Sequence, residues 1–459
     1  MKKDRILKPL ASLKLAVITI LALGGLTAWG TFVEANYQDA VAAQKIVYHS
    51  IWMYGAMGLL SINLIAVMVD RWPWQKKHTG FILAHIGILI LLAGSLVTRY
   101  QGIDGSMTIK IGEKSKYIVV SNTDLTLYSS FDGSSYTKLY DREVDFFSDR
   151  PSPTRPHEID MPQAKIKVLG FHPYAFRDQK VVATEETTAG AAVRFQLQND
   201  RVSVTEWLVQ TTQGREVVKD LGPAQIVFGN RAPSNEASNV IVMTPRPDGT
   251  LAYEIRSARA EKKTIKGIAK PGDVVETGWM GLVLRILKYM PHAKEEISFK
   301  PTHRKTDLTT EALEIEFNGK KHWLSLNSML KLFTDDAVYI LTYANRRLDS
   351  GLDITLTKFD VGRYQGTMRA ASYESTVDVP GVGSTLISMN EPLKHNGFTF
   401  YQASFNEDEQ GRPIESVLSV NRDPGRWIKY LGAFLIVFGC LHLFYYRRLY
   451  AAFNKGAAQ

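Results

Sequence analysis

Cysteine is almost absent from this sequence of 459 residues, which contains only Cys440. A single cysteine can form no disulfide within the chain, and it excludes the CxxC pairs that exchange thiols. The sequence also has no Gly-rich phosphate loop, no GxSxG elbow and no HExxH motif. We therefore expect no catalytic residues, and any thiol chemistry near this protein must be performed by another one.

The middle of the chain, residues 99–426, contains no apolar run long enough to span a membrane. Four such runs lie at the two ends, at residues 10–33, 50–69, 79–98 and 427–446. Each is long enough to cross the ~30 Å hydrocarbon core of a bilayer as a helix. The sequence predicts a membrane domain at 1–98, a large domain outside the membrane at 99–426, and a closing span with a tail at 427–459.

The formal net charge of +9 does not indicate a nucleic-acid partner, because the basic residues gather beside the apolar runs. With four crossings, all three basic clusters fall on one side of the membrane, as the positive-inside rule requires. We expect both termini in the cytoplasm of a bacterium, the first run to be an uncleaved anchor in the inner membrane, and residues 99–426 to be extracytoplasmic (periplasmic). The clusters are Lys2, Lys3, Arg5 and Lys8; Arg71, Lys76 and Lys77; and Arg447, Arg448 and Lys455.

The pattern of residues 99–426 is typical of β-structure. Short runs rich in Val, Ile, Thr and aromatic residues alternate with Gly, Pro, Asn and Asp. One short helix is conceivable at 324–332, and a boundary between two lobes is expected near Pro291. The predicted fold class is an α+β membrane protein in which four transmembrane helices, three N-terminal and one C-terminal, flank a large, mainly antiparallel β domain of sandwiches or open barrels.

The third apolar run has two distinct faces. Gly80, Gly87 and Gly94 recur every seven residues and form one helical stripe, which we expect to contact the first or second span. His85 lies roughly 140–180° away from this stripe at 100° per residue. An imidazole within a bilayer is costly without a partner and marks a functional site. A structural hydrogen bond is the alternative role for His85, whereas His78 and His442 are expected at the membrane interface.

The histidines of the middle region show no metal-ligand spacing, and we expect them to be surface or loop residues. The predicted β domain is accordingly a scaffold or a docking surface. These histidines are His157, His172, His292, His303, His322 and His395.

Three stretches carry a resemblance to a known family. They are SLKLAVITILAL in the first span, HIGILILLAGSLV followed by RYQGIDGSMTIKIGE, and FYQASF followed by VNRDPGRWIKYLGAFLIVFGC. Together with the order of spans and β domain, they resemble the ResB/CcsB family of cytochrome c biogenesis (System II). The matched stretches cover both membrane ends and the flanks of the β domain, and residues 130–380 contain none of them.

The resemblance implies a subunit of a holocytochrome c synthase (haem lyase) complex, which carries haem across the membrane and supports its attachment to apocytochrome c. The partner would be a ResC/CcsA-type membrane protein with a tryptophan-rich haem-handling loop, a segment that this sequence does not contain. The family position of a haem ligand in the third span maps to His85, which would share haem b transiently with the partner. A thioredoxin-like protein would supply reductant.

Two other classes of function are open at this point. One is a membrane-anchored b-type electron-transfer protein, in which His442 and either His78 or His85 bind haem within this chain. The other is a haem-free membrane scaffold or sensor with a ligand-binding β domain, in which an apolar replacement of His85 would leave function intact.

Overall fold

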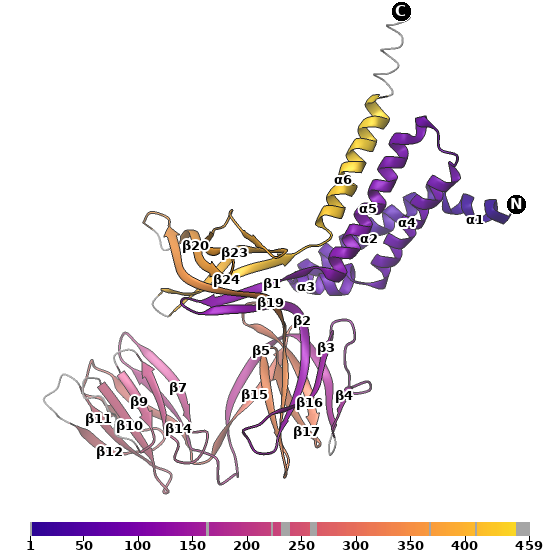
Figure 1. Ribbon diagram of the computed structural model, residues 1–459. Helices are drawn as coiled ribbons and strands as arrows, with labels where there is room; N and C mark the ends of the chain where they lie inside the picture. Colours follow the sequence, from indigo (N-terminus) through magenta and orange to yellow (C-terminus); the bar gives the residue numbers. More distant parts are fainter. Residues whose placement is uncertain are drawn as a thin grey trace, which may run out of the picture. The chain divides into compact units, whose positions relative to one another are not determined.

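The computed structural model describes residues 2–161, 165–221, 224–230, 239–257, 264–366, 369–408 and 411–446 (Figure 1). The chain divides into two compact units. Unit 1 combines Met1–Ala175 with Pro301–Gln459, and unit 2 is Phe176–Lys300. Pro291, near which a boundary between two lobes is expected, lies inside unit 2. The basic tail with Arg447, Arg448 and Lys455 lies outside the described residues.

Four helices of unit 1 are long and apolar enough to cross a membrane, which confirms the four expected apolar helices. They are the candidate spans Leu13–Tyr37, Ile51–Asp70, Lys76–Gln101 and Arg426–Tyr445. Serine N-caps begin the first two of these helices. Ser12 accepts a hydrogen bond from Leu15 N at 3.2 Å, and Ser50 accepts one from Met53 N at 3.3 Å. The helical elements are α1 (Lys2–Leu10), α2 (Leu13–Tyr37), α3 (Ala40–Ala43), η1 (Gln44–Tyr48), α4 (Ile51–Asp70), η2 (Lys76–His78), α5 (Thr79–Gln101), α6 (Arg426–Leu441) and η3 (His442–Tyr446).

The largest sheet of unit 1 has ten strands, in the order β21-β20-β19-β2-β1-β24-β23-β22, with β18 added to β19 and β3 added to β2. Its pairs are antiparallel, and two clusters of buried apolar side chains cover it. The strands are β1 (Ile103–Lys110), β2 (Lys114–Ser130), β3 (Thr137–Val144), β18 (Ser328–Phe333), β19 (Val338–Arg363), β20 (Ala370–Val379), β21 (Gly383–Ile387), β22 (Leu393–His395), β23 (Phe398–Glu407) and β24 (Pro413–Arg422).

A second sheet, β15-β5-β16-β17 with β4 beside β5, completes the β part of unit 1, and β5 and β15 carry the chain across the unit boundary. The helix considered at 324–332 is wrong, because β17 and β18 occupy those residues. Asn327 adopts the left-handed conformation (φ 56°), which turns the chain between the two strands. The strands are β4 (His157–Asp160), β5 (Lys165–Ala183), β15 (Ala293–Pro301), β16 (Thr309–Phe317) and β17 (Lys320–Ser325).

Unit 2 contains two sheets around one apolar core, ordered β12-β11-β10-β9-β8 and β13-β14-β6-β7. The pairs are antiparallel except β9 with β10, which run parallel. The expectation of a mainly antiparallel β region is thus confirmed. The strands are β6 (Ala192–Gln198), β7 (Ser203–Val209), β8 (Val217–Leu221), β9 (Ala224–Phe228), β10 (Asn239–Pro245), β11 (Leu251–Arg256), β12 (Ile265–Ala269), β13 (Val274–Glu276) and β14 (Val283–Met290).

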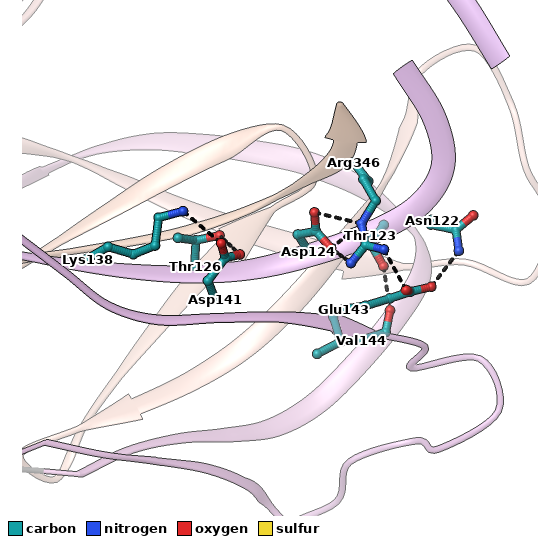
Figure 2. A network of polar contacts seen from close by, with 9 residues as sticks. All are labelled: Asn122, Thr123, Asp124, Thr126, Lys138, Asp141, Glu143, Val144 and Arg346. Atoms are coloured by element: carbon teal, nitrogen blue, oxygen red, sulfur yellow. Dashed lines mark hydrogen bonds and ion pairs between the residues drawn. The ribbon is translucent and has the colours of Figure 1, made fainter. Parts of the chain in front are cut away.

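An arginine clamp ties three neighbouring strands of the large sheet together. Figure 2 shows the guanidinium of Arg346 on β19 between Asp124 on β2 and Glu143 on β3. Its Nη2 donates to Asp124 Oδ1 at 2.7 Å, its Nε lies 3.1 Å from Oδ2, and its Nη1 donates to Glu143 Oε2 at 2.7 Å. Forked hydrogen bonds of this kind fix geometry better than a point charge does. The clamp therefore sets the register of β3, β2 and β19.

Replacing Arg346 by lysine is expected to lower the free energy of unfolding by about 1 kcal/mol, since one ammonium group cannot engage both carboxylates in a forked geometry. Arg412→Lys is the matched control, because among the described residues Arg412 forms an ion pair with the single carboxylate of Asp408, and its side chain is 71% exposed. Thermal unfolding of the two variants measures the difference. Equal midpoints would show that Arg346 does not hold the register.

Candidate functional site

His85 lies on α5, and its ring is oriented by its own helix. The Nδ1 atom lies 2.8 Å from the carbonyl oxygen of Phe81. Because a carbonyl oxygen can only accept, Nδ1 carries the proton and Nε2 keeps its lone pair. The ring centroid lies 3.8 Å from that of Phe81, over whose ring the Arg71 guanidinium stands at 3.7 Å. The half-buried imidazole thus holds a lone pair on the ring edge that faces away from its own backbone.

The glycine stripe of α5 contacts α6, so the expected contact with the first or second span is wrong. A Cβ at Gly87 would lie 2.7 Å from the carbonyl oxygen of Gly432, and one at Gly80 would lie 2.7 Å from that of Gly439. A Cβ at Gly439 would in turn lie 2.6 Å from Ala84 N. We call these facing glycines of α5 and α6 the glycine seam. It brings two backbones together as small residues do in membrane helices.

The other two membrane-end histidines do not share the surroundings of His85. His78 accepts a hydrogen bond from Gln75 N through Nδ1 at 3.3 Å, as a cap at the start of the third span. His442 follows α6 and lies on the seam, where its Nδ1 is 3.0 Å from the position of a Cβ on Gly80. His85 stands about 140–180° around α5 from the three glycines Gly80, Gly87 and Gly94 at 100° per residue. The two imidazoles therefore lie on different sides of α5.

The seam continues into the β part of unit 1. α5 leads into β1 and β24 leads into α6 (Figure 1), and β1 pairs with β24 from Ile103 opposite Arg422 onward. At the junction Asp423 accepts hydrogen bonds from Thr98 Oγ1 at 2.6 Å and from Lys429 Nζ at 2.8 Å. The helices α5 and α6 thus pack against each other, and the strands β1 and β24 that adjoin them pair in the same way.

The connection between α2 and α4 is fastened to the β part of unit 1 by a buried carboxylate. Asp39 is only 6% exposed and caps α3 by accepting a hydrogen bond from Val41 N at 3.1 Å. It also accepts hydrogen bonds from the Tyr174 hydroxyl at 2.9 Å and from Lys305 Nζ at 3.1 Å. The backbone N–H of Lys305 donates to Tyr37 O at 2.9 Å. These contacts hold the connection, residues 38–50, against the β part of unit 1.

A second, partly buried acid lies in the same part of unit 1. The Tyr343 hydroxyl donates a hydrogen bond to Glu311 on β16. Burial raises the pKa of the Glu311 carboxyl above its usual value of 4.5, despite the opposing effects of that hydrogen bond and of Lys45. Folding therefore shifts the equilibrium of this carboxyl toward its protonated form relative to the unfolded chain.

The stability of unit 1 is expected to fall as the pH rises above about 4.5. A carboxyl whose pKa is raised by folding contributes stability that is fully present below its unfolded pKa and is lost as the pH rises through its folded pKa. Glu311→Gln, which mimics the protonated acid, should flatten this pH dependence by about 2–5 °C of midpoint between pH 5 and 7.5. Thermal unfolding at several pH values measures it, and an unchanged slope in the variant would assign the dependence to other groups.

The histidines of the β region have separate partners. His157 lies 2.9 Å from the Tyr140 hydroxyl, His172 lies 2.7 Å from Glu314 Oε1, and His303 lies 2.9 Å from Asn36 Nδ2. Across the part of the chain that the structure describes, no group of three or more His, Cys, Asp or Glu could hold a metal ion. Haem iron needs fewer protein ligands than such a metal ion, because the porphyrin supplies the others. His85 could supply one of them through Nε2, since its Nδ1 is engaged by Phe81 O.

The sequence of this chain was compared with families and with individual proteins of known function. The model of the ResB-like family matches residues 334–416, which run from the segment before β19 into β24. Protein NrfI of Wolinella succinogenes is 22% identical over 428 residues, which cover 92% of this chain and 33% of the relative. The chain thus spans about a third of the length of this curated relative.

The architecture defines a membrane protein with a large β domain. The resemblance recognised in the sequence is confirmed, because part of the chain matches the ResB-like family model and most of it is similar to NrfI. The family match includes FYQASF, on which the resemblance was based, and extends it to residues 334–380, where no motif had been recognised.

Proposed function

We propose that this protein is a subunit of a System II cytochrome c synthase complex, which carries haem across the membrane and supports its covalent attachment to apocytochrome c. The match of residues 334–416 to the ResB-like family model supports a role in cytochrome c biogenesis. The observation that carries the finer proposal is the imidazole of His85, whose Nδ1 proton is engaged by Phe81 O and whose Nε2 lone pair is free. This chain acts as a non-catalytic subunit.

The surroundings of His85 suit a haem b whose iron is held by one ligand from this chain and one from a partner. Metal-binding histidines commonly donate their other ring N–H to a backbone carbonyl, as His85 does. Haem bound here would supply the iron and the vinyl groups that react with cysteine thiols, and His85 would hold one axial position of the iron. The second axial ligand comes from a ResC/CcsA-type partner with a tryptophan-rich loop. This division of ligands explains why His85 stands away from the seam of its own chain.

The rest of the complex follows from this assignment. Both termini lie in the cytoplasm of the bacterial inner membrane and the β domain lies in the periplasm, as the basic clusters predict. The β domain holds apocytochrome c or the partner's haem loop near the exit. Because Cys440 is the only cysteine, a thioredoxin-like protein keeps the apocytochrome thiols reduced.

A b-type electron-transfer protein is the second candidate. The adjacency of α5 and α6 favours it, since ligands for one haem must come from neighbouring helices. It is the weaker candidate because His442 lies on the seam while His85 lies on another side of α5. The purified chain would have to show a full bis-histidine haem spectrum without a partner.

Co-expression with and without the tryptophan-rich partner tests the proposal. We expect membrane haem, measured by the Soret absorbance of the purified complex, and haem-stained cytochrome c only when both proteins are present. Cytochrome c maturation by the partner alone, at the same level, would overturn the assignment. Maturation that depends on this chain without any haem in the complex would leave a haem-free scaffold.

A further inference from the structure

A narrow cavity of about 90 Å³ lies in unit 1, where the connection between α2 and α4 meets the β part. Tyr37, the last residue of α2, lines one side of it. The 25 residues of α2 cover about 37 Å at 1.5 Å per residue, which is more than the ~30 Å hydrocarbon core of a bilayer. Tyr37 therefore reaches the level of the lipid headgroups at the end of this candidate span, and the cavity lies beside it.

The walls of the cavity are aromatic and aliphatic. Phe146 and Phe171 are buried, and their ring centroids lie 5.9 Å apart. Phe147 packs against Phe171 edge to face, with the centroids 5.2 Å apart. Ala42 and Ile46 of the α2–α4 connection line the cavity as well, and Ile46 is 41% exposed although it is apolar. None of the described lining residues is an aspartate or a glutamate, so the interior suits an apolar group.

The volume of the cavity selects a slender group. An apolar cavity of about 150 Å³ holds one benzene molecule, so a smaller one does not enclose an aromatic ring. An unbranched hydrocarbon chain is thinner, and a short segment of it can lie between the walls while the rest of the chain stays outside. Each CH₂ group that leaves water for such walls favours binding.

A cation stands at the edge of this apolar cavity. The guanidinium of Arg150 donates two hydrogen bonds to the carbonyl oxygen of Phe171, from Nε at 3.1 Å and from Nη2 at 2.8 Å. These bonds fix the position of the group but do not neutralise its charge, because the carbonyl is uncharged. A guanidinium has five N–H donors, and Arg150 is exposed, so donors remain for a second acceptor.

The carboxylates close to Arg150 in the sequence have other partners. Lys45 Nζ lies 3.6 Å from Asp145, and Arg155 pairs with Asp149. Each of these two pairs is neutral, so Arg150 leaves one positive charge at the cavity. Arginine binds phosphate oxygens through two parallel hydrogen bonds, and basic sites beside membrane helices bind anionic headgroups.

We propose that this cavity binds one phospholipid with an anionic headgroup. A segment of one acyl chain lies between the aromatic walls, and the phosphate lies on Arg150. The lipid would contact the end of α2, the α2–α4 connection and the segment between β3 and β4, so it would strengthen the contact between the helices and the β part of unit 1. The proposal uses neither His85 nor the function proposed above.

The test is a lipid titration of the delipidated full chain in nonionic detergent micelles, followed by native mass spectrometry. Dioleoyl phosphatidylglycerol and dioleoyl phosphatidylcholine are the lipid probes, and glycerol 3-phosphate is the headgroup probe without acyl chains. Arg150→Gln should weaken binding of phosphatidylglycerol about fivefold and leave phosphatidylcholine unchanged, because it removes the charge alone. Ala42→Leu fills the cavity and should weaken both lipids about tenfold.

Two further variants keep this test decisive. Arg201→Gln removes an exposed arginine from unit 2, and it should bind both lipids like the parent chain. Because Ala42 is fully buried, the thermal midpoint of Ala42→Leu without lipid shows whether the variant folds. Ile46→Ala shortens an exposed part of the wall and replaces it if it does not, with an expected loss of about threefold for both lipids.

Equal lipid binding by the parent chain and by the Arg150 and cavity variants would be annular lipid and would overturn the proposal. Binding of glycerol 3-phosphate as tight as that of phosphatidylglycerol would assign Arg150 to free phosphate and would overturn it too. So would a parent chain that binds no lipid. In that last case, failure of Ala42→Leu to bind a co-expressed partner would assign the cavity to a side chain of that protein.

Discussion

His85→Ala is expected to assemble with its partner and to lose about nine-tenths of the haem held in the membrane. In the proposed role the alanine removes a ligand of the haem iron, and the hydrogen bond lost with it joins two residues of the same helix. Added imidazole should occupy the vacated coordination position and partly restore cytochrome c maturation. Haem content of the purified complex and haem-stained cytochrome c are the two measurements.

The control for this variant is His78→Ala, which removes a histidine from the start of the same span. That histidine accepts a hydrogen bond from Gln75 N, so its loss should leave the haem content unchanged. Full haem content and maturation in His85→Ala would contradict the ligand role and favour a haem-free scaffold. Loss of haem in both variants would point to a general defect of α5.

Gly87→Leu should separate α5 from α6. A Cβ at this position lies 2.7 Å from Gly432 O and 2.8 Å from Ile436 N, both of which are backbone atoms that cannot rotate away. Overpacking of this kind costs about 1–3 kcal/mol, and here it also removes the close contact of two membrane helices. We expect a lower yield of folded protein in detergent and a thermal midpoint lower by about 5 °C or more.

Gly24→Leu provides the same change of residue on α2, where nothing lies within 4 Å of an added Cβ. Its midpoint should stay within about 1 °C of the unmodified chain. Equal behaviour of the two variants would show that the seam does not hold the third and fourth spans together. A defect only in Gly24→Leu would indicate that a partner covers that face of α2.

Hydropathy and a single ionisable residue were sufficient to predict the spans and to select His85, because both signals are local in the sequence. The partner of the glycine stripe could not be predicted in this way. Gly80 and Gly87 repeat every seven residues, and so do Gly432 and Gly439, but nothing in the sequence says that these two pairs meet. A match between repeats of equal spacing in two spans is the signal that could have suggested it.

Other parts of the structure depend on contacts between distant residues. Asp39 belongs to a short polar loop in the sequence, and its burial follows from Tyr174 and Lys305, which are far along the chain. In the sequence His292 is one of several scattered histidines, and only the meeting of loops in unit 2 places it on the same cavity as Arg246. The helix considered at 324–332 failed because its apolar spacing also suits two short strands joined at Asn327.

The pairing of β1 with β24 has a consequence for the order in which the protein is made. Gln101 and Arg426 end and begin the two helices of the seam, and the entire β region is synthesised between them. Closing so long a loop by diffusion of α6 within the bilayer would cost conformational entropy. The eight paired positions from Ile103–Arg422 to Lys110–Glu415 bring the two helix ends together as the sheet forms. Folding of the β region should therefore precede docking of the last helix, so a slowly folding β variant would delay the packing of α6 against α5.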